Sequence, residues 1–174
     1  MRTTNARTPY LYLLLAMVCL SAIYFYPFWS SSISWMRNAQ FQYENRIPVK
    51  LPFRWVSGEG AGLALLKPAA SINSFRQDAR FFLTDNGPDF NPNDQTRSRL
   101  LHDLGIVTSQ GAPNEPTYPL TSAGLLCSRI PLKAEQSDIV WLHCFSSNFR
   151  YSLSYMGPKP YIAEASQIAK QIVR

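Results

Sequence analysis

Close to its N-terminus the chain carries a long run of apolar residues without a single charge. The run extends from Tyr10 to Phe28 and contains 19 residues. A helix of this length, at about 1.5 Å rise per residue, matches a bilayer hydrocarbon core of about 30 Å. The pattern therefore predicts one transmembrane helix over residues 10–29, preceded by a cytoplasmic N-terminus of residues 1–9.

Aromatic side chains gather at both ends of this run, as is typical of the boundary between lipid and water. A cleaved signal peptide is the alternative, but it would have a shorter apolar stretch followed by small residues. Ser30–Ser32 leave cleavage open, whereas the length and the bulky aromatic end favour a retained anchor. The predicted membrane-interface residues are Tyr10, Tyr12, Tyr24, Phe25, Tyr26, Phe28 and Trp29.

Basic residues near the run predict its orientation. Arg2 and Arg7 precede it with no acidic neighbour, whereas Arg37 is the only basic residue soon after it. Because Lys and Arg are retained on the cytoplasmic side, we expect the N-terminus inside and the rest of the chain exported, to the periplasm or the extracellular side.

The remaining chain is long enough for one domain with its own apolar core. Residues 30–40 either extend the helix or act as a tether, and residues 41–174 are predicted to form an exported globular α+β domain. The chain has 17 Lys and Arg against 11 Asp and Glu, scattered without a dense basic patch. Nucleic-acid binding therefore has no support.

The first half of the domain shows short extended segments. Alternation at Phe41 and Tyr43 predicts a strand, and residues 63–67 and 79–84 predict two more. Residues 47–57 are also extended, but Pro48 and Pro52 place them at a sheet edge or in a bend. A short helix is expected from Asn93 or Asp94 to about residue 104, followed by a proline-containing connection over residues 107–121.

The C-terminal third predicts three antiparallel strands over residues 125–132, 139–145 and 151–156, followed by a helix over residues 161–173. The apolar positions of that helix share one face, which indicates packing across the sheet. The fold class expected is α+β, an antiparallel sheet with a packed C-terminal helix. The shared face consists of Ile162, Ala165, Ile168, Ala169 and Ile172.

Cys127 and Cys144 form the candidate disulfide. A hairpin centred between residues 135 and 136 places them directly opposite each other, with Cys127 on the first strand and Cys144 on the second. The same register pairs apolar residues, namely Leu126 with Phe145, Ile130 with Trp141 and Leu132 with Ile139. An exported compartment permits the bond. Pro131 favours an edge strand and could shift the register, so two unpaired thiols remain the alternative.

Motifs for catalysis or metal binding are weak. The glycines between Gly58 and Gly62 lack the lysine of a phosphate-binding loop and indicate a turn. The oxygen-rich segment from Asp85 to Asp94 does not fit the calcium-loop pattern. Neither His102 nor His143 has the spacing that zinc requires. The sequence predicts no catalytic residue, no metal site and no cofactor.

These observations favour a non-enzymatic accessory or scaffold subunit of a membrane protein complex. Its expected partners are membrane lipid and integral-membrane proteins. The alternative is a solitary membrane-anchored module that binds a small ligand or peptide in a cleft near residues 107–121. An anchored enzyme ranks third.

Overall fold

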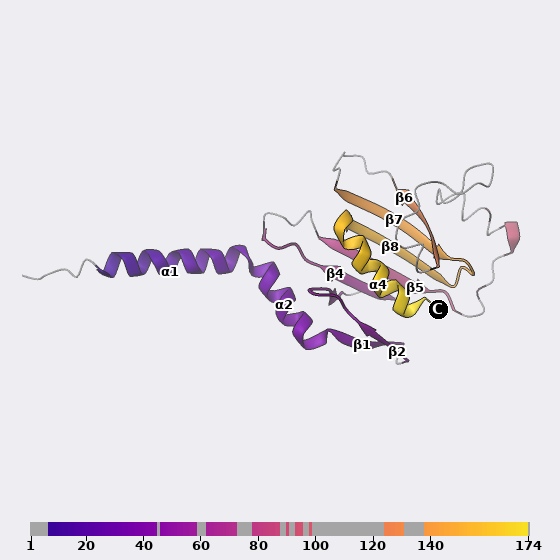
Figure 1. The fold of residues 1–174 in the computed structure, drawn as a ribbon, viewed down its shortest axis with the longest axis horizontal. Coiled ribbons are helices and arrows are strands. Elements are labelled where there is room, and N and C mark those ends of the chain that lie inside the picture. Colours follow the sequence, from indigo (N-terminus) through magenta and orange to yellow (C-terminus); the bar gives the residue numbers. More distant parts are fainter. Residues whose placement is uncertain are drawn as a thin grey trace, which may run out of the picture.

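The protein is an α+β molecule in which two N-terminal helices precede a sheet-rich domain (Figure 1). The computed structural model describes residues 7–44, 46–58, 62–72, 78–87, 90, 93–95, 98, 124–130 and 138–173. Helix α1 spans Arg7–Tyr24 and helix α2 spans Tyr26–Asn38. In Figure 1, α1 projects away from the domain, and α2 connects it to the first strand.

The apolar run predicted one helix continuous through Phe28. The structure instead has two helices in this segment. The break lies at Phe25, and α2 begins with Pro27 in its first turn. Proline has no backbone N–H and disfavours the helical conformation in the residue before it, so a helix tends to end or bend there. Residues 30–38 are helical, which is the first of the two possibilities considered for this segment.

The described residues of the domain form two antiparallel sheets. The smaller pairs β1 (Gln40–Tyr43) with β2 (Ile47–Lys50). The larger has the order β3-β4-β5-β8-β7-β6. Its N-terminal strands are β3 (Val56–Ser57), β4 (Leu63–Lys67) and β5 (Ala79–Asp85), and its C-terminal strands are β6 (Leu125–Ile130), β7 (Ile139–Ser146) and β8 (Tyr151–Pro158). The pairing of β5 with β8 joins the two halves.

Helix α4 (Ile162–Ile172) covers one face of the larger sheet, after a short 3-10 helix, η3 (Lys159–Tyr161) (Figure 1). All five residues of its predicted apolar face are buried. They pack in one core with Phe81, Leu142 and Leu153 of the sheet. Near the C-terminal end of α4, the Gln171 side-chain amide accepts from the Lys50 N–H at 2.8 Å and donates to the Lys50 carbonyl at 3.1 Å. These bonds hold the edge of β2 against the helix.

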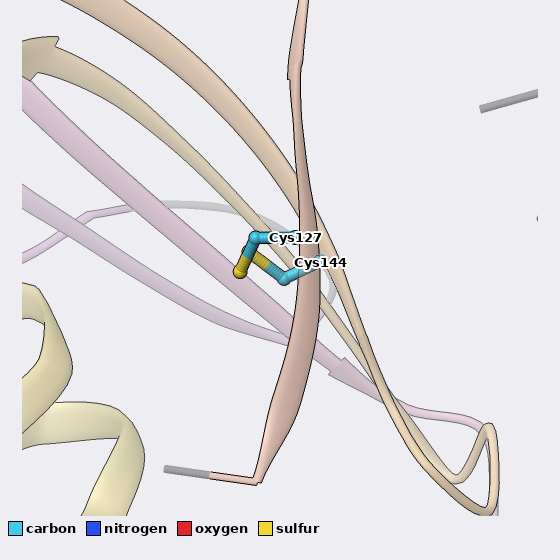
Figure 2. Close-up of a disulfide and its surroundings, with 2 residues drawn as sticks. All are labelled: Cys127 and Cys144. Carbon is cyan, nitrogen blue, oxygen red and sulfur yellow. A yellow bond between two sulfur atoms is a disulfide. The ribbon is translucent and has the colours of Figure 1, made fainter. Parts of the chain in front are cut away.

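The predicted disulfide is present between Cys127 and Cys144 (Figure 2). The register of β6 and β7 is the predicted one, with Leu126 opposite Phe145 and Ile130 opposite Trp141. Strand β6 lies at the edge of the sheet, as Pro131 indicated. Both cysteines are buried on the face that α4 covers, so the bond lies inside the core.

The other predicted strands are also confirmed. The strand at Phe41 is β1, and the extended residues 47–57 divide into β2 and β3 with a bend between them. Among the strands that the structure describes, β2 pairs only with β1, which suits Pro48 at an edge. Most of the helix predicted from Asn93 or Asp94 to about residue 104 lies outside the described residues. The connection over residues 107–121 and His102 lie wholly outside them.

Gly157 allows β5 and β8 to approach closely. A Cβ atom at this position would lie 2.7 Å from Cα and 2.8 Å from Cβ of Ala79, which is itself fully buried. We therefore expect Gly157→Ala to lower the free energy of unfolding by about 1–3 kcal/mol, the usual range for overpacking. Chemical denaturation measures the effect. Met156→Ala, at the adjacent exposed position, is the control, and an equal loss in both variants would contradict the close-approach explanation.

Candidate functional site: the junction between the N-terminal helices and the domain

Arg54 is buried although it is charged, and it lies where the domain meets α2. The chain turns after β2, with the Trp55 N–H donating to the Pro52 carbonyl at 3.2 Å. Arg54 adopts a left-handed φ of 67° within this turn. A non-glycine residue in this conformation is strained, and the surrounding contacts must hold it there. The turn directs the side chain back under α2, where it is only 5% exposed.

The guanidinium of Arg54 joins three segments of the chain. Its Nε donates to Ser31 Oγ of α2 at 2.9 Å, and one Nη donates to the carbonyls of Pro68 and Ala69, each at 2.8 Å. The cation also lies 4.5 Å from the ring centroid of Phe28. Burial lowers the pKa of this guanidinium, but arginine stays protonated at any physiological pH. The junction is therefore held by a permanent buried cation with fixed hydrogen-bond geometry.

Aromatic packing extends the junction along α2. The Phe53 ring lies edge to face with Phe28 and Trp35, with centroids 6.3 and 5.2 Å apart. Trp35 Nε1 donates to the Leu51 carbonyl at 3.0 Å. Ser31 and Ser32 of the same helix are also buried. Helix α2 is thus docked against the domain along one face by both apolar and polar contacts.

The opposite face of α2 is exposed and largely apolar. Tyr26, Trp29, Ile33 and Met36 follow one another at helical spacing, and 47–67% of each side chain is exposed. An open trough runs along this face and continues onto α1, where its lining includes Met17 and Ala22. Tyr26, Trp29, Ile33 and Met36 are called the outer stripe below.

Most of the predicted membrane-interface residues are exposed, but one of them is packed against the domain. The side chains of all of them except Phe28 are exposed on α1, at the break or on the outer stripe. Phe28 instead contacts Phe53 and Arg54 of the domain. Sequence reasoning missed Arg54, since an arginine between two aromatic residues carries no local sign of burial. The only local signal was Pro52, which predicted a bend there.

A second polar cluster ties β4 to α4. Lys67 Nζ and Trp55 Nε1 both donate to Glu164 Oε2, at 2.6 and 2.5 Å. The same ammonium group lies 4.3 Å from the ring centroid of Tyr161. Because the lysine and the glutamate neutralise each other and Trp55 is fully buried, this cluster stabilises the helix on the sheet.

Asp85 belongs to an ion pair and not to a group of metal ligands in the described structure. Burial alone would raise the pKa of its carboxyl, but hydrogen bonds from the Arg150 guanidinium and the Gly87 N–H outweigh burial and hold that pKa below its ordinary value. Asp89 and Asn91 lie outside the described residues. No group of three potential metal ligands occurs among the residues described.

The ion pair between Asp85 and Arg150 predicts an acid-sensitive contribution to stability. Because the folded-state pKa of Asp85 is lowered, its contribution is present above the unfolded value of about 3.9 and is lost as pH falls through the folded value. We expect the thermal midpoint of Asp85→Asn to fall less steeply with acid than that of the wild type. Scans at a series of pH values measure this. Parallel curves would contradict the assignment.

His143 and Cys144 do not form a nucleophile pair. They are neighbours on β7 and face opposite sides of the sheet, and Cys144 is bonded to Cys127. The His143 ring lies 5.5 Å from that of Phe145, and burial lowers the pKa of its imidazole. Burial favours the neutral imidazole, and the contact with Phe145 indicates a packing role for His143.

No protein-family model matches this sequence, and a search of curated proteins finds no match. Within the described part of the chain, no single helix has both the length and the apolarity to cross a membrane. Tyr10–Tyr24 and Tyr26–Asn38 meet that criterion only together, as a pair bent by 63°.

Proposed function

We propose that this chain is a membrane-anchored, non-enzymatic accessory or scaffold subunit, with a cytoplasmic N-terminus and an exported α+β domain. The observation that carries the proposal is the junction at Arg54. A solitary binding module needs only a loose tether to its anchor. A buried guanidinium that joins α2 to the turn at Arg54 and to Pro68 and Ala69 instead fixes the domain relative to the helices.

Helix α1 supports the anchor. Its uncharged part, Tyr10–Tyr24, rises about 22 Å at about 1.5 Å per residue, and together with α2 it has the length and apolarity expected of a membrane span. Every side chain from Tyr10 to Tyr24 is exposed, so this apolar surface has no cover within the described protein. Such a surface is expected to contact lipid or another protein.

The disulfide supports export. Cys127 and Cys144 form a buried bond in the core, and structural disulfides persist mainly in oxidising compartments. Together with Arg2 and Arg7 before the anchor, this bond favours an exported domain and a cytoplasmic N-terminus.

The test is extraction in a mild detergent at native expression, followed by size-exclusion chromatography and mass spectrometry of the co-eluting proteins. The proposal predicts integral-membrane partners in constant ratio to the intact chain. Arg54→Leu should reduce their recovery, whereas Arg80→Leu, at an exposed position on β5, should not. A chain that elutes alone would reject the subunit role and direct attention to the solitary binding module.

A further inference from the structure

The outer stripe of α2 lies on the side of the helix that the domain leaves uncovered. Phe28, Ser31, Ser32 and Trp35 form the docked face. Tyr26, Trp29, Ile33 and Met36 recur at three- and four-residue spacing on the other side and are exposed. The domain therefore covers one side of α2 and leaves the apolar outer stripe uncovered.

The trough shows which way the outer stripe faces. One part of it is lined by Leu14, Met17 and Val18 of α1 together with Trp29, and the other by Ala22 with Tyr26 and Ile33. The two parts share Ala22 and Trp29, so side chains of both helices line the trough. Residues of the outer stripe therefore share the trough with residues of α1, on the side of α2 that the domain leaves uncovered.

The bend gives α2 a defined tilt. The two helices meet at 63°. If α1 crosses a bilayer along its normal, α2 lies closer to the membrane plane than to the normal, with the outer stripe toward the lipid and the docked face toward the domain.

Charge and residue type favour lipid as the occupant of the trough. No acidic residue occurs before Glu44 in the sequence, and the exposed Arg37 lines the trough at the end of α2. A cation at this place complements lipid phosphates. The outer stripe contains Tyr and Trp, which favour the lipid–water boundary.

We propose that α2 is an interfacial helix whose outer stripe inserts into the outer leaflet of the bilayer, with Arg37 at the phosphate level. Because the other face of α2 is fixed to the domain by Arg54, the inserted helix sets the height and orientation of the domain above the membrane. This inference rests on the proposed anchoring of α1.

The test places a nitroxide at single cysteines in the full chain, reconstituted in nanodiscs of phosphatidylcholine and phosphatidylglycerol. Cys19→Ala removes the free thiol, and the disulfide leaves no other. Labels at Ile33→Cys and Met36→Cys report on the outer stripe, and both positions are exposed, so the core is undisturbed. Gln167→Cys, on the exposed side of α4, is the water-facing control, and Leu14→Cys reports on α1.

Collision rates with oxygen and with a water-soluble nickel chelate distinguish lipid from water. We expect labels at 33 and 36 to show a several-fold higher ratio of oxygen to chelate collisions than the label at 167, approaching the label at 14. Water-like values at 33 and 36 with a lipid-like value at 14 would overturn the interfacial helix alone. Water-like values at all three would overturn the anchor as well.

A protein occupant gives a different result. If labels at 33 and 36 are open to the chelate in nanodiscs but become protected when the chain is extracted with its partners, the trough holds a partner helix and the lipid proposal is wrong.

Discussion

Replacing Arg54 with leucine is expected to release α2 from the domain while the sheet stays folded. The substitution removes the donors that now satisfy Ser31 Oγ and the carbonyls of Pro68 and Ala69. Leaving buried acceptors without donors costs about 1–3 kcal/mol for each group. A total of about 3 kcal/mol corresponds to about a hundredfold in the equilibrium between docked and undocked helix.

Hydrogen exchange in detergent micelles measures this effect. Amides of the buried turn of α2, around Ser31 and Ser32, should exchange about a hundredfold faster in Arg54→Leu. Amides of β8 around Leu153 should keep their protection. Arg80→Leu removes an exposed arginine from β5 and serves as the matched control. Unchanged exchange in α2 would show that aromatic packing by Phe53 and Trp35 holds the helix without the arginine.

Loss of the disulfide is the second large effect that we expect. The bonded cysteines are 17 residues apart in sequence. The chain-entropy model assigns a closed loop of this size about 3 kcal/mol of stability, through restriction of the unfolded chain. The double variant Cys127→Ala/Cys144→Ala should therefore lower the free energy of unfolding by about 3 kcal/mol.

Urea denaturation followed by tryptophan fluorescence measures the loss. A reducing agent should destabilise the wild type to a similar extent and should leave the double variant unchanged. Cys19→Ala, in the exposed apolar helix α1, is the control and should have no effect. Equal denaturation midpoints for wild type and double variant would contradict a stabilising role for the bond.

The C-terminal half of the fold could be predicted because its signals are local. Strands β6 and β7 are rich in apolar residues, and a single hairpin centre pairs both the cysteines and Leu126 with Phe145. The period of two leaves little choice of register once one face must be buried. The joining of β5 to β8 was not predicted, because strands 65 or more residues apart leave no pairing signal in one sequence.

In the N-terminal segment, the apolar composition led to a wrong prediction of one continuous helix. The uncharged run to Phe28 suggested one helix, and Pro27 within it was given too little weight. Ser30–Ser32 suggested a linker or a cleavage region, yet Ser31 and Ser32 are buried on the docked face of α2. Ser31 Oγ also donates to the Pro27 carbonyl at 2.6 Å, so the serine is satisfied within the helix as well as by Arg54.

The junction itself could not be predicted. Arg54 is buried because a left-handed turn directs it under a helix that lies more than 15 residues earlier in the chain. Neither the turn geometry nor the position of Ser31 is a local property of the residues around Arg54. Buried arginines of this kind become visible only when the chain segments that surround them are placed together.

The central claim is that one chain joins a bilayer anchor to an exported domain. Its most direct test is labelling of a single cysteine, Lys170→Cys in a Cys19→Ala background, with a membrane-impermeant maleimide on spheroplasts. Lys170 is exposed on α4. The account predicts full labelling from outside and an intact chain that stays with the membranes after an alkaline carbonate wash. A cysteine labelled only after lysis, or a labelled domain released into the soluble fraction, would contradict it.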